Sequence, residues 1–189
     1  MSTPDFDPVL DRLHRLLDSR RVLEALRFIE ELEEEKRNTT DILRLKCSAH
    51  SFPAGDINEA YAISRELAVR SDNNIGDLYL AGQRAAEFRD YKDAEAFLSS
   101  AIDRSKQEED RYYLDCSLLL RAYVRLHLQK MSLVKEDLDE VADDEGEIFW
   151  SKKLGYISKE NLLACLSNQG SSQISSTVPC SCRKPPQSE

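Results

Sequence analysis

Residues 77–102 read DLYLAGQRAAEFRDYKDAEAFLSSAI and decide the fold. Apolar residues return every three or four positions on both sides of a short polar stretch, which predicts two helices joined by a tight turn. Gly82 in the first helix and Ala94 in the second are small, so they let the helices approach closely. Tyr91 and Leu98 are large enough to fill the space between the two helices.

The same unit occurs four times along the chain. Each copy contains a large apolar residue, two mostly polar residues and a small apolar residue. The copies begin at Val22, Ile57, Tyr91 and Met131, which are 35, 34 and 40 residues apart. An apolar stripe with helical spacing precedes and follows each segment, so we expect four helix–turn–helix units. The second unit carries an insertion-like turn at residues 52–55.

Residues 77–102 resemble a tetratricopeptide repeat (TPR) without a gap. The residues on positions typical of that family are Leu78, Ala81, Gly82, Tyr91, Ala94, Leu98 and Ala101. The resemblance extends over residues 5–145. It implies an all-α fold, a right-handed superhelix of about four TPR-like helix pairs with a C-terminal capping helix.

Three segments follow the repeats. We predict a loop with aromatic anchors over residues 143–157, because it contains Gly146 and Gly155. Ser158 and Asn161 predict the start of the capping helix over residues 158–167. Its expected buried stripe is Leu162, Leu163 and Leu166. The rest is rich in Ser and Pro, so we expect a repeat domain at residues 5–168 and a disordered tail at residues 169–189.

Composition and charge exclude several classes of function. The chain has 189 residues, 41% of them hydrophobic, and a net charge of −9. Such an acidic chain would be repelled by phosphate, so we expect no nucleic-acid binding and favour a basic partner. No stretch approaches the roughly 20 apolar residues that a membrane helix needs, and the N-terminus lacks the features of a signal peptide. Five widely spread cysteines indicate free thiols, and we expect a cytoplasmic protein.

We find no signature of catalysis or metal binding. The sequence contains no H-E-x-x-H, G-x-S-x-G, P-loop or GxGxxG motif. One residue separates Cys180 from Cys182, which is too few for a zinc knuckle. We therefore expect no enzyme, no cofactor and no metal. An enzyme whose site is assembled in space, for example from Cys47 and a distant histidine, is a remote alternative.

The resemblance to TPR proteins also implies a groove lined by the first helix of each repeat. In the second repeat its positions are Leu45, Ala49 and Phe52; in the third and fourth they are Tyr79, Gln83, Glu87, Leu119, Tyr123 and His127. None is the Lys, Asn or Arg with which chaperone-binding members hold a carboxylate. The expected groove is aromatic and mostly neutral, so it suits an apolar or basic segment.

A second candidate docking surface is the acidic stretch at residues 135–147. It carries eight acidic residues against the single base Lys135. We expect an exposed strip formed by Asp137, Asp139, Glu140 and Asp144. Like charges at helical spacing are slightly destabilising, which a docking role would explain; a solvated surface without a role is the alternative.

The C-terminal pattern narrows the expected function. Residues 118–165 are similar to small bacterial repeat proteins that are encoded beside polymorphic toxins and are thought to be immunity proteins. The resemblance implies a protein that binds and neutralises a cognate toxin. A basic toxin domain would complement the acidic chain. The alternative is a cytosolic TPR adaptor or scaffold in another pathway.

Overall fold

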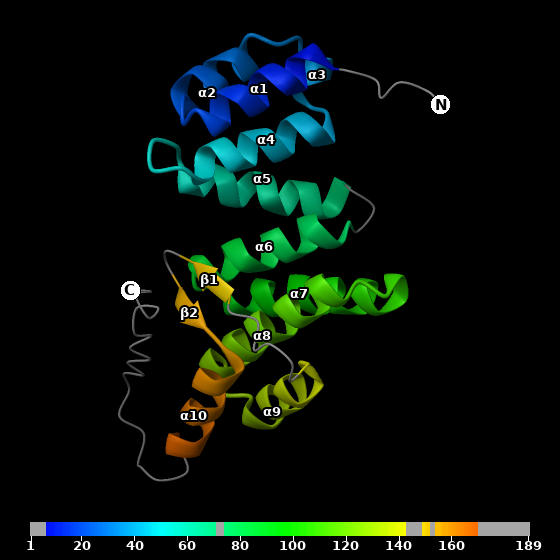
Figure 1. Cartoon of the computed structure of the whole chain (residues 1–189), viewed down its shortest axis with the longest axis vertical. Helices are drawn as coiled ribbons and strands as arrows, with labels where there is room; N and C mark the ends of the chain where they lie inside the picture. The colour runs from blue at the N-terminus through cyan, green and yellow to red at the C-terminus, as the bar shows by residue number, and fades with distance from the viewer. Residues whose placement is uncertain (1–6, 71–73, 143–148, 152–153, 170–189) are drawn as a thin grey trace, which may run out of the picture. The chain divides into compact units, whose positions relative to one another are not determined.

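A computed structural model describes residues 7–70, 74–142, 149–151 and 154–169 (Figure 1). These residues are mostly helical, which confirms the predicted predominance of helix. The chain divides into two compact units, residues 1–73 and residues 74–189.

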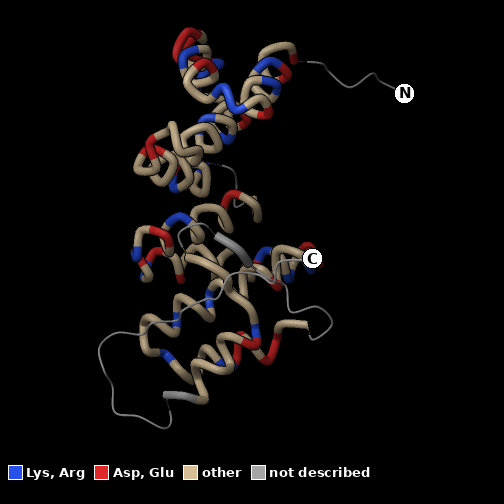
Figure 2. Tube along the Cα trace, turned by 60° about the vertical axis from the view of Figure 1, so that its left-hand side comes forward, with Lys and Arg blue, Asp and Glu red and all other residues tan. Residues whose placement is uncertain are grey.

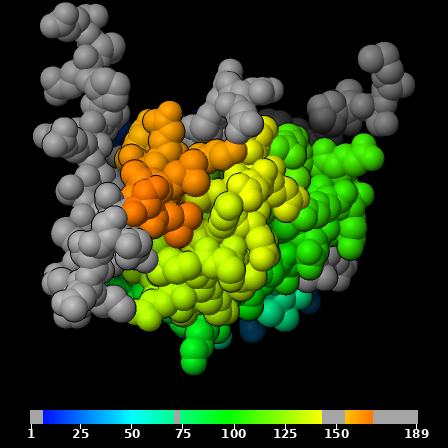
Figure 3. Space-filling view, turned by 90° about the horizontal axis from the view of Figure 1, so that it is seen from below, coloured from blue at the N-terminus to red at the C-terminus, as the bar shows by residue number. Residues whose placement is uncertain are grey.

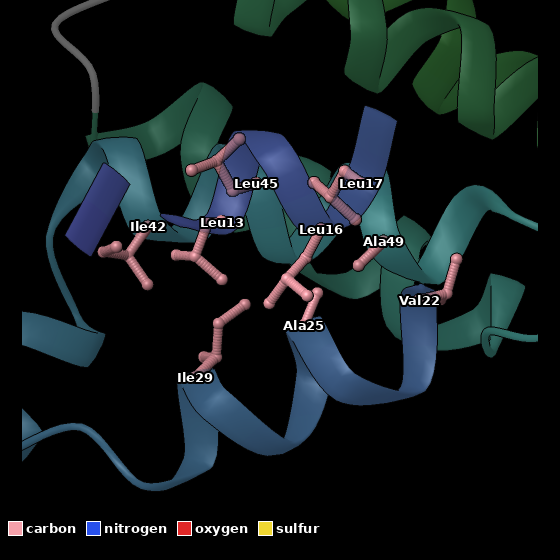
Figure 4. Close-up of a cluster of buried hydrophobic side chains, with 9 residues drawn as sticks. All are labelled: Leu13, Leu16, Leu17, Val22, Ala25, Ile29, Ile42, Leu45 and Ala49. Carbon is pink, nitrogen blue, oxygen red and sulfur yellow. The ribbon is translucent and has the colours of Figure 1, made fainter. Parts of the chain in front are cut away.

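Unit 1 consists of helices packed in pairs. Its elements are α1 (Pro8–Asp18), α2 (Val22–Glu30), α3 (Glu34–Arg37), α4 (Thr40–Ser51) and α5 (Ile57–Arg70). Helix α1 packs on α2, α4 packs on α5, and α4 also contacts the first pair. Figure 4 shows the buried cluster that these contacts create, formed by Leu13, Leu16, Leu17, Val22, Ala25, Ile29, Ile42, Leu45 and Ala49. The sequence did not predict α3.

Unit 2 contains two further helix pairs and a small C-terminal layer. Its elements are α6 (Ile75–Glu87), α7 (Tyr91–Glu108), α8 (Arg111–His127), α9 (Met131–Glu140), β1 (Phe149–Ser151), β2 (Gly155–Ile157) and α10 (Lys159–Gln169). Helix α6 packs on α7, α8 packs on α9, and α7 packs on α8. The two strands are antiparallel, with Trp150 opposite Tyr156.

The four predicted repeats coincide with the four helix pairs. Val22, Ile57, Tyr91 and Met131 are the first residues of α2, α5, α7 and α9. The small residue three positions later in each helix is fully buried; these residues are Ala25, Ala60, Ala94 and Val134. The sequence pattern therefore located each turn and each close helix contact. The right-handed superhelix stays a prediction.

Three of the four turns share one backbone geometry. Arg20, Arg89 and Gln129 have φ angles of 56°, 61° and 59°, in the left-handed region. In each turn the amide of the next residue donates to a carbonyl five residues earlier, at 2.8–2.9 Å. This hydrogen-bond pattern is the Schellman helix end. The second pair uses the predicted insertion instead, where a Cβ on Gly55 would lie 2.5 Å from His50 Cα.

Gly82 permits the close approach predicted for the third repeat. A Cβ built on Gly82 would lie 2.6 Å from Cγ and 2.8 Å from Cδ2 of Leu98 in α7. Leu98 itself is fully buried. The third repeat therefore has the predicted contact between a glycine in its first helix and a large residue in its second.

The C-terminal segment differs from the prediction in two respects. Strands β1 and β2 form a hairpin where a loop was expected, because short paired strands can satisfy backbone groups without a long periodic pattern. A helix is present where the capping helix was predicted: α10 packs on α8 and α9 (Figure 3), and Ser158 Oγ accepts the amide of Asn161 at 3.2 Å. Leu162 is buried, but the prediction for Leu163 is wrong, since it is 40% exposed.

The predicted tail begins one residue too early. Gln169 belongs to α10, and residues 170–189, with Cys180 and Cys182, lie outside the described residues. Among the described residues, Cys47, Cys116 and Cys165 are not joined to one another by a disulfide.

Candidate protein-binding surface

Three tyrosines from two helices form a cluster on unit 2. The rings of Tyr79 in α6 and Tyr113 in α8 are 5.6 Å apart and inclined by 61°. The rings of Tyr112 and Tyr113 are 5.2 Å apart and inclined by 77°. Tyr79 and Tyr113 are half-buried, whereas Tyr112 is 62% exposed. Edge-to-face contacts of this kind hold the rings in fixed orientations. We call Tyr79, Tyr112 and Tyr113 the tyrosine cluster.

The starts of α6 and α8 position the tyrosine cluster. Asp110 caps α8 by accepting the amide of Tyr113 at 3.1 Å, and Asn74 caps α6 by accepting the amide of Asp77 at 3.3 Å. Gly76 leaves room for the neighbouring ring, since its Cβ would lie 3.0 Å from the Tyr113 hydroxyl. The sequence prediction included Tyr79 and missed Tyr112 and Tyr113, although two adjacent tyrosines opening a helix were a visible signal.

A second aromatic group lies toward the other end of α8. His127 stacks on Tyr91 with ring centres 4.6 Å apart and an interplanar angle of 4°. Tyr123 meets the same imidazole edge-on at 4.6 Å. Partial burial lowers the pKa of His127 below its ordinary value, and the charge of Arg89 lowers it further. The predicted site residues Tyr123 and His127 are therefore in contact.

The centre of α8 is covered, which contradicts the predicted role of Leu119. Residues 116–120 are all buried, and Leu119 has no exposed surface. Five consecutive buried residues span more than one helical turn, so every face of α8 is covered there. Helix α8 contacts α6, α7, α9, α10 and both strands of the hairpin. Leu119 is a core residue, and the predicted groove is not open along the length of α8.

Glu87 is also withdrawn from solvent. Its side chain is 4% exposed and accepts from Arg84 Nη1 at 2.7 Å and from Gln83 Nε2 at 3.3 Å. Gln83 is half-buried. Both predicted site residues thus make contacts within α6, and the Glu87 side chain offers little surface to a partner. The predicted groove residues that keep their rings near the surface are Tyr79, Tyr123 and His127.

The predicted acidic strip is interrupted by a buried ion pair. Asp137 is 2% exposed and accepts from Arg121 Nη2 at 2.6 Å and from Arg125 Nη1 at 2.8 Å. A buried carboxylate needs such partners, so Asp137 is a structural residue and its predicted role at the surface is wrong. Asp139 and Glu140 are exposed, and Glu140 pairs with Lys106 at 2.6 Å. Asp144 lies outside the described residues.

The same ion pair extends into a network that joins three helices. Arg125 Nε donates to Glu95 of α7 at 3.0 Å, and Lys130 donates to the other carboxylate oxygen at 2.6 Å. Arg121 Nη1 donates to Ser99 Oγ at 3.0 Å. Burial alone would raise the pKa of Glu95, but the hydrogen bonds from Lys130 and Arg125 outweigh it and hold the pKa below its ordinary value. The network fixes α8 against α7 and α9.

Figure 2 shows basic and acidic residues interspersed along the described helices. Among the described residues, no group of three or more His, Cys, Asp or Glu side chains is arranged to hold a metal ion. Within those same ranges, no helix combines the length and apolar character needed to cross a membrane. Comparison of the chain with family models, curated proteins and solved structures gave no match.

Proposed function

We propose that this chain is a non-catalytic protein-binding module of the TPR type, and most concretely a cytoplasmic bacterial immunity protein that binds and neutralises a toxin. The tyrosine cluster carries the proposal. Tyr112 is 62% exposed and its ring rests against Tyr113, which in turn meets Tyr79. Tyrosines are enriched among the residues that dominate binding energy, because they offer large contact area with few torsions to fix.

The scaffold supports the proposal because it holds these rings rigidly. Tyr79 stands on α6 and Tyr112 on α8, and both helices are capped at the end that carries the ring. Farther along α8, the network of Arg121, Arg125 and Asp137 fixes this helix to α9. Binding by a rigid surface loses less conformational entropy than binding by a mobile one.

Charge supports a basic partner. The chain carries a net charge of −9, and α9 exposes Glu136 and Asp139. An acidic surface attracts a basic protein from solution and raises the association rate, and this attraction weakens as salt is added. A basic toxin domain would meet these conditions.

Co-expression tests the proposal. The proposal predicts a toxin encoded beside this gene. That toxin is expressed in a bacterial host with the wild-type chain or with a Tyr79→Ala, Tyr112→Ala double variant. We expect the wild-type chain to restore growth and the double variant to lose most of that protection. Leu23→Ala is the matched control, because Leu23 is 64% exposed but lies on unit 1.

Two outcomes would contradict parts of the proposal. If the wild-type chain does not protect against a neighbouring toxin, the immunity function is wrong, and an adaptor that binds another cytosolic protein remains. If the double variant protects as well as wild type while Glu136→Lys with Asp139→Lys abolishes protection, the docking surface is α9 and not the tyrosine cluster.

A further inference from the structure

A groove between α1 and α2 of unit 1 has a charge opposite to that of the chain. It encloses 730 Å³ and is lined by Pro8, Arg12, Arg15, Leu16, Ser19, Arg21, Glu24, Arg27, Phe28 and Glu31. Four of these residues are arginines and two are glutamates. The lining therefore carries two net positive charges within a protein of net charge −9.

Two of the four arginines, Arg12 and Arg27, are not neutralised by an ion pair within the described residues. Arg21 Nε donates to Glu24 at 2.8 Å, and Arg15 pairs with Asp11. Arg12 instead lies over the ring of Phe28, with its guanidinium carbon 4.0 Å from the ring centre. Within the described residues, neither Arg12 nor Arg27 forms an ion pair. Both side chains belong to exposed residues.

Besides the hydrogen bond from Arg21, both Arg12 and Arg27 lower the pKa of Glu24, one of the two glutamates in the groove. The hydrogen bond from Arg21 lowers the pKa of Glu24, and burial opposes it. The charges of Arg21, Arg27 and Arg12 add to the lowering. Arg12 on α1 and Arg27 on α2 thus act on the same part of the groove, and an additional carboxylate there would meet a positive field.

We propose that this groove binds a short acidic peptide segment of a partner protein, whose carboxylates pair with Arg12 and Arg27. Guanidinium groups match carboxylates because their planar N–H donors form paired hydrogen bonds. Phe28 and Pro8 give an apolar side chain of the segment a surface to contact. A long polyanion such as a nucleic acid is disfavoured, since the rest of the acidic chain repels it.

The inference is independent of the proposed function, which places a basic partner on unit 2. The probe is a fluorescein-labelled peptide of about seven residues, glutamates and aspartates around a central tryptophan, and binding to the full chain is followed by fluorescence anisotropy. We expect saturable binding that weakens with salt and that falls about fivefold in an Arg12→Gln, Arg27→Gln double variant.

Controls separate a specific groove from general attraction. Arg65 is also exposed and also lies near an aromatic ring, that of Tyr61, at 5.7 Å, so Arg65→Gln should bind the acidic peptide as wild type does. Any binding of the same peptide with lysine at every acidic position should be unchanged or stronger in the double variant, because that peptide does not use Arg12 and Arg27. The inference is overturned if the acidic peptide does not bind, if the double variant binds it equally well, or if a single-stranded oligonucleotide binds more tightly through the same arginines.

Discussion

Arg121 and Asp137 form a bidentate ion pair between α8 and α9, in which Nη2 and Nε of the arginine donate to the two carboxylate oxygens at 2.6 and 3.3 Å. Asp137 is 2% exposed, and the Arg121 side chain is 12% exposed. Arg125 Nη1 adds a third donor, 2.8 Å from Oδ1 of the same carboxylate. The acidic residues of α9 therefore differ in role: Asp137 is buried and stabilises the fold, whereas Asp139 is exposed to solvent.

Asp137→Ala should destabilise unit 2 strongly. It leaves Arg121 and Arg125 without their shared carboxylate in a mostly buried site, and removing one member of such a pair costs about 3 kcal/mol. Urea unfolding measures the loss. Asp139→Ala is the control and should change stability by less than about 0.5 kcal/mol, because Asp139 is exposed. Equal effects of the two substitutions would show that Asp137 is not buried in solution.

Gly82→Ala tests the helix contact of the third repeat through the sign of its effect. Alanine favours a helix over glycine by about 1 kcal/mol, so the variant would be more stable if there were space. The new Cβ would lie 2.6 Å from Leu98 Cγ, so we expect a net loss of about 1–2 kcal/mol instead. Gly76→Ala should cost less than Gly82→Ala, because the atom nearest to its Cβ, the Tyr113 hydroxyl, would lie 3.0 Å away. A higher melting temperature for Gly82→Ala would refute the contact.

Gln129→Gly should stabilise the chain although it removes a side chain. Gln129 is exposed and has a φ angle of 59°, which glycine adopts without the steric cost that other residues incur. We expect a gain of about 0.5–1 kcal/mol in thermal unfolding. The same replacement at Lys135, exposed within α9, should lose about 1 kcal/mol. If both variants lose stability, the left-handed turn is not formed.

Acidification should weaken unit 1 through His50. Its Nδ1 accepts the amide of Asp56 at 3.2 Å, so this nitrogen must be unprotonated. Burial lowers the pKa of His50, Lys46 lowers it further, and Glu59 and Asp56 oppose the shift. The unfolded chain then binds the proton more readily, so the stability contributed by neutral His50 is complete above about pH 6.5 and is lost as pH falls through the lower folded pKa.

Urea unfolding at pH values between about 7.5 and 5 checks this dependence. His50→Asn keeps an acceptor near the Asp56 amide but does not titrate, so its stability should fall less over that range. A residual slope is expected, because the pKa of His127 is also lowered. Identical slopes for wild type and variant would exclude His50 as a source of the effect.

The helix pairs could be predicted from sequence because their determinants are local. A large residue at Tyr91 and small residues at Gly82 and Ala94 specify a turn and a close contact within about 26 residues, and the structure has both. The second aromatic group was partly predictable for the same reason, since Tyr123 and His127 lie four apart on one helix.

The errors occur where contacts cross between elements. Asp137 resembles its exposed neighbours in sequence, and the partners that bury it, Arg121 and Arg125, lie 16 and 12 residues away. Leu119 occupies a position that would line a groove in a regular repeat, but the centre of α8 is covered on every side in this chain. The hairpin that contacts α8 has strands of three residues, which are too short to give an alternating pattern.

The proposed function predicts a toxin domain encoded beside the gene of this chain. The affinity of the purified chain for such a domain tests the central claim most directly. Titration calorimetry of the wild-type chain should give a stoichiometric complex, and Tyr112→Ala should weaken it at least about tenfold, which corresponds to roughly 1.4 kcal/mol for an exposed aromatic at the centre of an interface. Leu23→Ala should bind as wild type does. The absence of a complex, or a Tyr112→Ala variant that binds with unchanged affinity, would contradict binding through the tyrosine cluster.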